Sequence, residues 1–210
     1  MTFDVFGDFE TRGYLRNIAG LKDLQQVKTL EYISFQAGLE DAIKALNKPG
    51  PLTYQNILDT HRILFSSVYP WAGQDRTATA PNVAITKGGI AYFADSLEIR
   101  RAAEHSLAVG AAAIAKKPGE VMGYLAYAHP FLEGNGRTIM LVHSEMCRRA
   151  GIHIDWKQVD KTEYLKALSD ELLRPGKGAL DRFLSPYVHE RRLEASEIRT
   201  QIGEIKGLSR

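Results

Sequence analysis

The chain of 210 residues contains 44% hydrophobic and 25% charged residues, proportions that are ordinary for one globular domain with a hydrophobic core. Its formal net charge of +2 is too small to indicate nucleic-acid binding or attraction to an anionic membrane. A single cysteine, Cys147, excludes an internal disulfide bond, and neither a secretory signal nor a stretch of roughly 20 apolar residues is visible, so a cytoplasmic protein with no membrane span is expected.

The first half of the chain has the periodicity of amphipathic helices. A helix is predicted from residue 23 to residue 46, where apolar residues recur at the spacing of one helical face and Asn47-Lys-Pro-Gly50 ends the pattern. Thr53 is predicted to cap a second helix that reaches about Phe65. His61 falls on the apolar face of this helix, which favours a buried structural histidine over a catalytic one.

Residues 68–93 have a different pattern. Val68-Tyr-Pro-Trp-Ala-Gly73 is aromatic and prone to turns, and its rings are expected to lock this loop into the core. Residues 83–86 and 90–93 are two short β-prone segments joined by a turn that contains glycine, so a β-hairpin is predicted.

Helical periodicity then returns for most of the remaining chain. Helices are predicted over residues 95–115, 120–128 and 138–150, and another begins at Asp160. The tail that follows is charged and weakly periodic, so it is either a last helix or a linker. The expected fold class is mainly α with one small β-hairpin.

One segment between two predicted helices, His129–Arg137 with the sequence HPFLEGNGR, breaks the helical pattern. Gly134 and Gly136 allow a positive φ and a close approach of the main chain to a ligand, and Asn135 tolerates such conformations better than most residues. Successive N–H groups that lead into a helix N-terminus form an anion-binding concavity. The segment therefore predicts a phosphate-binding loop.

Three charged or titratable side chains in the same loop fit this role. Arg137 in the first helical turn opposes the helix dipole, at a cost of about 0.3–1 kcal/mol unless an anion binds there. Glu133 supplies a carboxylate suited to a Mg²⁺ ion that bridges phosphate oxygens. His129 is a candidate general base, because histidine titrates near neutral pH. Each of these residues alone has a structural explanation, and the functional prediction depends on their lying together.

The loop resembles the Fic family motif His-Pro-Phe-x-(Asp/Glu)-Gly-Asn-Gly-Arg-x-x-Arg. Further segments that resemble the family are Thr60-His-Arg-Ile-Leu-Phe65, Val68–Gly73, Arg76-Thr77 and Ile85-Thr-Lys-Gly88. We therefore expect a Fic-like catalytic domain over residues 1–190, followed by a C-terminal helix or linker over residues 191–210. The resemblance implies a helical bundle with a β-hairpin flap, and Mg²⁺-dependent transfer of AMP from ATP to a Tyr, Thr or Ser hydroxyl of a target protein.

The resemblance also implies a role for each matching residue. His129 would deprotonate the target hydroxyl, and Glu133 would hold Mg²⁺. The nucleotide phosphates would be bound by Gly134, Asn135, Gly136 and Arg137. The target main chain would pair as an added strand with the flap residues Ile85, Thr86, Lys87 and Gly88.

The chain departs from the motif at Met140, where the family usually has a second arginine. Loss of a charge-assisted phosphate contact costs about 1.5–3 kcal/mol. We therefore expect weaker nucleotide binding, or compensation by another basic residue, with Arg76 and Lys87 as candidates. Two alternatives stay open: transfer of another phosphate-linked group such as UMP or phosphocholine, and a weakened nucleotide-binding module.

A second departure concerns control. Many family members carry an inhibitory helix with the pattern (Ser/Thr)-x-x-x-Glu-(Gly/Asn). Thr200-Gln-Ile-Gly-Glu204 matches only loosely, because Ile205 follows it, and such a match is expected by chance. The resemblance therefore points to a separate small inhibitor, as in toxin–antitoxin pairs, or to no such control. The alternative to a toxin with its inhibitor is an effector protein that acts in a host cytoplasm.

Overall fold

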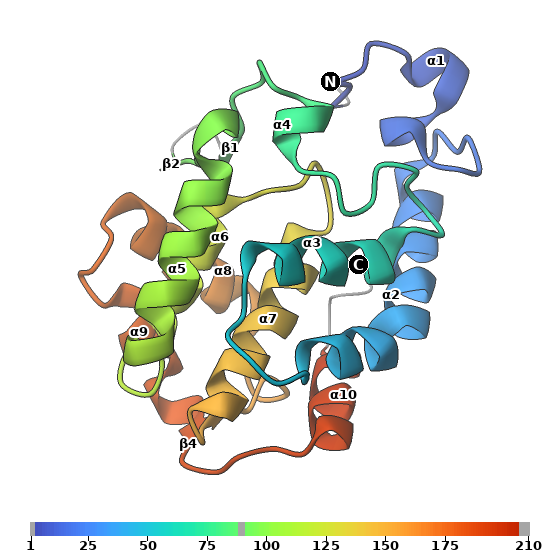
Figure 1. Cartoon of the computed structure of the whole chain (residues 1–210). Helices are drawn as coiled ribbons and strands as arrows, with labels where there is room; N and C mark the ends of the chain where they lie inside the picture. Colours follow the sequence, from blue (N-terminus) through green and yellow to red (C-terminus); the bar gives the residue numbers. More distant parts are fainter. Residues whose placement is uncertain (1–2, 88–90, 206–210) are drawn as a thin grey trace.

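The computed structural model describes residues 3–87 and 91–205 and is mostly helical, which confirms the predicted mainly α fold (Figure 1). The α-helices are α1 (Phe9–Arg12), α2 (Leu24–Leu46), α3 (Tyr54–Phe65), α4 (Arg76–Thr79), α5 (Ile99–Ala113), α6 (Pro118–Ala128), α7 (Asn135–Arg149), α8 (Lys161–Leu173), α9 (Ala179–Leu184) and α10 (Ala195–Gly203). Short 3-10 helices are η1 (Tyr14–Arg16), η2 (Ser96–Glu98) and η3 (Ser185–Tyr187). The strands are β1 (Thr86–Lys87), β2 (Ala91–Tyr92), β3 (His153–Ile154) and β4 (Val188–His189).

The strands form two small antiparallel sheets. β1 pairs with β2, with Thr86 opposite Tyr92, which confirms the predicted hairpin, although it is shorter than expected. β3 pairs with β4, and this second sheet was not predicted. Its strands have two residues each, too few for the alternating pattern by which a strand is recognised in a sequence.

Helices α2 and α3 begin at the capping residues that the sequence predicts. Asp23 accepts hydrogen bonds from the N–H groups of Gln25 and Gln26 at 2.8 and 3.0 Å. Thr53 and Asn56 form a capping box at the start of α3. Each cap of this kind contributes about 1 kcal/mol to stability. The caps fix where the two helices that flank the candidate site begin.

Helix α7 lies at the centre of the molecule, between α2 and α3 on one side and α6 on the other (Figure 1). Its polar side chains are buried along with its apolar ones, among them Asn135, Arg137 and His143. Because neighbours enclose α7 along most of its length, the N-terminus of this helix has a fixed position.

The last described helix, α10, packs on α2. Its residues Ile198 and Ile202 are buried, and Gln36 Nε2 donates a hydrogen bond to the Gly203 carbonyl at 2.9 Å. The structure therefore has a helix in the tail, one of the two forms that the sequence allowed. The domain boundary at residue 190 stays a prediction.

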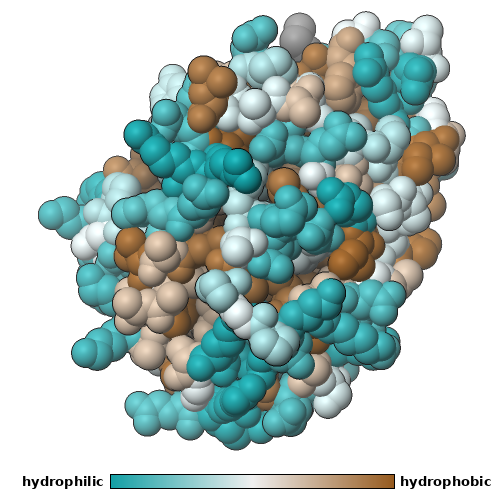
Figure 2. All heavy atoms as spheres, viewed as in Figure 1, coloured by the Kyte–Doolittle hydropathy of each residue, from teal (hydrophilic) through white to brown (hydrophobic). Residues whose placement is uncertain are grey.

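Hydrophilic side chains cover most of the face shown in Figure 2, with a paler, more apolar group over α5. Within residues 3–87 and 91–205, no helix is both long enough and apolar enough to cross a bilayer. Cys147 is buried in α7, and burial raises the pKa of its thiol. A protonated, enclosed thiol of this kind has a structural role, as the sequence predicts.

Candidate active site

The loop between α6 and α7 has left-handed backbone conformations at both ends. His129 has φ 39° and ψ 59°, and Gly134 has φ 78°. Such a conformation costs a non-glycine residue on the order of 1–2 kcal/mol, so other contacts must hold His129 in place. At Gly134 a Cβ atom would lie 2.7 Å from the Phe65 ring and 3.1 Å from His61. This glycine is therefore required by packing as well as by its φ.

Arg76 holds His129 in its left-handed conformation. Its side chain is fully buried, with Nε donating to the His129 carbonyl at 2.8 Å and Nη2 donating to the Ala94 carbonyl at 2.6 Å. Its main-chain N–H donates to the Pro130 carbonyl at 2.8 Å. Arg76, one of the two candidates to compensate for Met140, is therefore excluded from that role, because its side chain is enclosed in the core with Nε and Nη2 bonded to main-chain carbonyls.

Asn135 closes the loop. Its Oδ1 accepts a hydrogen bond from the Phe131 N–H at 2.9 Å, and its Nδ2 donates to the Phe131 carbonyl at 2.7 Å. Any phosphate contact by Asn135 would therefore fall to its main-chain N–H. The N–H groups of Asn135, Gly136 and Arg137 precede the first helical hydrogen bond of α7, which Thr138 donates at 3.1 Å. They are the donors that a helix N-terminus offers to an anion.

His61 braces the loop from α3, as a buried structural histidine should. Its Nδ1 accepts the Gly73 N–H at 2.9 Å, so the proton lies on Nε2, which donates to the Glu133 carbonyl at 3.0 Å. Its ring stacks on Phe131 with the centroids 3.7 Å apart. Burial lowers the pKa of His61 to about 3, which keeps the ring neutral.

Arg137 is paired with a carboxylate that the sequence analysis did not single out. Glu31 on α2 accepts a hydrogen bond from Arg137 Nη2 at 2.5 Å and another from the Tyr69 hydroxyl at 2.5 Å. The Arg137 guanidinium also lies over the Phe65 ring, 4.7 Å from its centroid. Both partners of this ion pair are almost fully buried. Arg137 is thus held at the start of α7 by a fixed partner.

The sequence does carry a signal for Glu31. It lies four residues after Val27 and four before Phe35, both of them buried, so it occupies the apolar face of α2. A carboxylate on such a face needs a buried partner. That reasoning would have indicated an ion pair, although not the identity of the cation.

Glu133 lies where the loop meets this ion pair. Its Oε1 accepts the Gly134 N–H at 2.9 Å and lies 3.9 Å from Arg137 Nη2. Burial, and then the neighbouring Glu31 carboxylate, raise the pKa of Glu133. A bound cation would offset the repulsion between the two carboxylates.

Two hollows meet at the N-terminus of α7. The first, which we call the histidine hollow, has a volume of about 410 Å³ and is lined by Ile85, Thr86, Phe93, Met122, His129 and Ile139, among others. The second, which we call the charged hollow, has a volume of about 280 Å³ and is lined by Lys28, Glu31, Glu133, Arg137, Met140 and Lys161, among others. Gly136 borders both. The two spaces therefore meet where the free N–H groups of the helix begin.

The histidine hollow brings the predicted base and the predicted flap together. The His129 ring stacks on Phe93 with the centroids 3.8 Å apart. Ile85 and Thr86 line the same space from the flap. Lys87 belongs to β1, and Gly88 lies outside the described residues. His129, Ile85, Thr86 and Asn135 thus line the histidine hollow, Glu133, Gly134 and Arg137 line the charged hollow, and Gly136 borders both.

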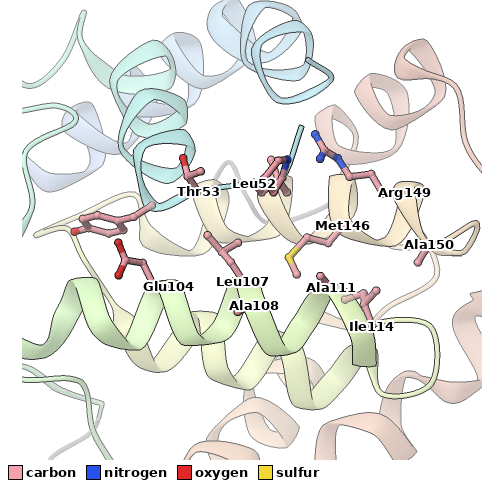
Figure 3. A pocket seen from close by; sticks show the side chains of 12 residues that line it. Leu52, Thr53, Glu104, Leu107, Ala108, Ala111, Ile114, Met146, Arg149 and Ala150 are labelled. Carbon is pink, nitrogen blue, oxygen red and sulfur yellow. The ribbon is translucent and has the colours of Figure 1, made fainter. Parts of the chain in front are cut away.

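A third space, the apolar hollow, lies at the other end of α7 (Figure 3). It has a volume of about 450 Å³ and is lined mainly by Leu52, Leu107, Ala108, Ala111, Ile114 and Met146. Arg149 borders it, but its guanidinium donates to Glu145 at 2.7 Å and to the Leu46 carbonyl at 2.8 Å. This space is larger than the charged hollow, yet its lining is mainly apolar and offers few groups that could bind or react with a polar ligand.

Comparison with known proteins shows related sequences. The sequence model of the Fic/DOC family matches residues 51–147. "Protein adenylyltransferase VbhT" of Bartonella schoenbuchensis is 32% identical over 178 residues, which are 78% of this chain and 35% of that protein. "Probable protein adenylyltransferase y4lH" of Sinorhizobium fredii is 30% identical over 73% of this chain and 81% of that protein. The chain thus spans about a third of the length of VbhT and most of the length of y4lH.

Solved structures show the same fold. The BepC protein of Bartonella tribocorum, crystallised with bound AMPPNP, has a TM-score of 0.69 at 19% identity, over 84% of this chain and 92% of that chain. The N-terminal Fic domain of a putative cell filamentation protein from Bartonella quintana, crystallised with bound ADP, has a TM-score of 0.70 at 21% identity, over 83% and 90% of the two chains.

Proposed function

The chain belongs to the Fic/DOC family, and from this premise we propose that it transfers AMP from ATP to a hydroxyl side chain of a target protein. One observation supports the proposal: His129 lines a hollow that Gly136 also borders, at the start of α7, where main-chain N–H groups precede the first helical hydrogen bond. A base beside a phosphate site is what phosphoryl-group transfer to a hydroxyl needs. The names of the two relatives, both adenylyltransferases, support the choice of AMP.

The two hollows suggest how ATP would be divided between them. The apolar walls of the histidine hollow suit a planar base and its sugar. The charged hollow suits the β- and γ-phosphates. The α-phosphate would then lie at Gly136, within reach of the N–H groups that begin α7.

The chemical step is an in-line displacement at the α-phosphorus. His129 accepts the proton of the target hydroxyl as its oxygen forms a bond to phosphorus. The bond from phosphorus to the bridging oxygen of pyrophosphate breaks, and pyrophosphate leaves into the charged hollow. The main-chain N–H groups of Asn135, Gly136 and Arg137 stabilise the charge that develops on the transferred group.

Glu133 is the residue that would hold Mg²⁺. Proteins usually bind this ion through one or two carboxylates together with substrate phosphates, and Glu133 is one of the carboxylates that line the charged hollow. Its raised pKa reflects burial and the negative charge of Glu31, which a divalent cation would balance. When bound, the ion neutralises charge on the phosphate oxygens.

The flap is the proposed docking site for the target. β1 and β2 form a two-stranded sheet, so β1 has an edge that an extended segment can join. Ile85, Thr86, Lys87 and Gly88 would pair with the target main chain, with Gly88 outside the described residues. Since Ile85 and Thr86 line the histidine hollow, a docked segment would present its side chains near His129.

The test is a transfer assay with labelled ATP and Mg²⁺ on a broad protein extract. We expect label on Tyr, Thr or Ser with the wild-type chain, none with His129→Ala, and more with Met140→Arg. Mass spectrometry identifies the modified residue. If neither wild type nor Met140→Arg transfers label, the proposed function is wrong.

Two alternatives have distinct outcomes in the same assay. Transfer of UMP or phosphocholine would appear as label from UTP or CDP-choline and not from ATP. A weakened nucleotide-binding module, for which Met140 is the argument, would bind ATP without turnover. The intact set of His129, Glu133 and Arg137 favours turnover.

Control by a separate small inhibitor protein, or action as an effector in a host cytoplasm, also belongs to the proposal. Several Bartonella effector domains share the fold, and the chain covers 35% of VbhT. Purification of the chain from its own cells, followed by mass spectrometry, would show whether a small helical protein accompanies it.

A further inference from the structure

The charged hollow holds more cations than the loop motif supplies. Besides Arg137, it is lined by Lys28 from α2 and Lys161 from α8. Met140 lies buried in the same hollow, at the motif position where a second arginine is usual. The part of the hollow that would face the outer phosphates is therefore lined by Met140 on α7 and by lysines on two other helices.

The charge of Arg137 is already balanced. Its guanidinium donates to Glu31 at 2.5 Å inside the core, where an ion pair is strongly coupled. Glu133 adds a second negative charge to the same hollow. A leaving pyrophosphate brings several more negative charges, so its stabilisation needs positive charge beyond that of Arg137.

Lys28 is placed to supply part of that charge. It lies three residues before Glu31 on α2, so both side chains project from the same face of the helix. Lys28 lines the charged hollow together with Glu31, Glu133 and Arg137. Its ammonium group therefore lies at the proposed phosphate site.

Lys161 reaches the hollow from α8, of which it is the first residue. It lines the hollow together with Met140 and Arg137. Lys28 and Lys161 belong to helices that are far apart in the sequence, and the hollow is what brings them together.

We propose that Lys28 and Lys161 bind the β- and γ-phosphates and so replace the arginine that Met140 removes. The inference rests on the proposed function and names the residues that distinguish a nucleoside triphosphate from a monophosphate. Lysine acts as a point charge on a flexible stem, whereas arginine is a rigid fork. The contact should therefore weaken as ionic strength rises.

The experiment is calorimetric titration of the chain with ATP and with AMP in the presence of Mg²⁺. The variant K28A/K161A should bind ATP about tenfold more weakly and AMP within about twofold of wild type. The conservative variant K28R/K161R should keep most of the ATP affinity. The matched control K44A/K166A removes one lysine from each of the same two helices, outside the hollow, and should leave both affinities unchanged.

The outcomes separate the inference from its premise. Equal losses for ATP and AMP, unchanged ATP affinity in K28A/K161A, or a similar loss in K44A/K166A would each overturn the role of the two lysines. If wild type binds neither nucleotide, the proposed function itself fails. Thermal denaturation verifies folding, and the single variants K28A and K161A, each expected to lose about threefold in ATP affinity, serve if the double variant is unstable.

Discussion

The two ends of α7 border hollows of similar size but different chemistry. At its N-terminus, main-chain N–H groups without helical partners lie beside Glu133 and Arg137, and the spaces there have volumes of about 280 and 410 Å³. At its C-terminus, the apolar hollow has a volume of about 450 Å³. There Arg149 donates to the carbonyls of Leu46 and Gly50, so its polar atoms are already bonded.

The difference teaches that volume alone does not make a binding site. The lining must also offer hydrogen-bond donors, acceptors or charges that can bind a ligand. A helix leaves donors at one end and acceptors at the other. In this molecule the loop HPFLEGNGR leaves the first N–H groups of α7 available to a ligand. The Arg149 guanidinium at the other end already donates its hydrogen bonds to groups within the fold. Four predictions test this contrast, from the largest expected effect to the smallest.

His129→Ala should have the largest effect. Removal of a general base lowers the rate of transfer about 10²–10⁴-fold, whereas the binding of ATP should change little because the N–H donors of α7 remain. The measurement is the rate of labelled-AMP transfer beside calorimetric ATP affinity. A variant that transfers at the wild-type rate would show that His129 is not the base.

Arg137→Ala should destabilise the fold by about 3–5 kcal/mol, because it leaves the Glu31 carboxylate buried without its cation. The measurement is urea denaturation. Arg191→Ala is the control, since its ion pair with Glu197 is exposed and should be worth less than about 1 kcal/mol. Equal losses in the two variants would mean that the donor end of α7 is not held by the Glu31 pair.

Acid should destabilise the fold through two buried histidines, His61 beside the loop and His143 within α7. Burial lowers the pKa of His61 to about 3 and that of His143 to about 4, against about 6.5 in an unfolded chain. Between these folded and unfolded pKa values the unfolded state binds more protons than the folded state. The stability that the two neutral histidines contribute is therefore complete above about pH 6.5 and is lost as the pH falls toward 3. The melting temperature, measured by thermal denaturation over this pH range, should fall less steeply with acid in His61→Gln than in the wild type. If it falls equally steeply in both, His61 does not contribute to the acid sensitivity.

Ala108→Leu, which adds a side chain in the apolar hollow, should have the smallest effect. Ala108 is exposed on α5, and substitutions at such positions usually change stability by less than about 0.5 kcal/mol. Both ATP affinity and transfer should stay within twofold of wild type. A large loss of transfer would give the apolar hollow a functional part that its walls do not indicate.

Much of the fold is predictable because its signals are local. The caps at Asp23 and Thr53, the proline that opens α6 and the glycines of the loop each act within a few residues. The position of the loop between two helices was predictable for the same reason, since its sequence motif is continuous. Helix α7 begins three residues earlier than expected because Gly134 caps it, and a glycine cap leaves no side-chain signal.

The parts that were missed depend on residues far apart in the sequence. Glu31 pairs with Arg137 across 106 positions, and no local pattern indicates which cation a buried carboxylate will meet. Arg76 was one of two candidates to compensate for Met140, because a sequence shows its charge but not its burial against His129. Lys28 and Lys161 become neighbours of the loop only when α2 and α8 enclose it.

The braces on the loop come from three separate parts of the chain: Glu31 on α2, His61 on α3 and Arg76 on α4. Each brace exists only after its own element has docked against the loop. We therefore expect that a chain that is still completing its core lacks the assembled loop and gains transfer activity only when these contacts have formed. We expect loss of transfer on heating to coincide with loss of helical structure, with no active, partly folded form in between.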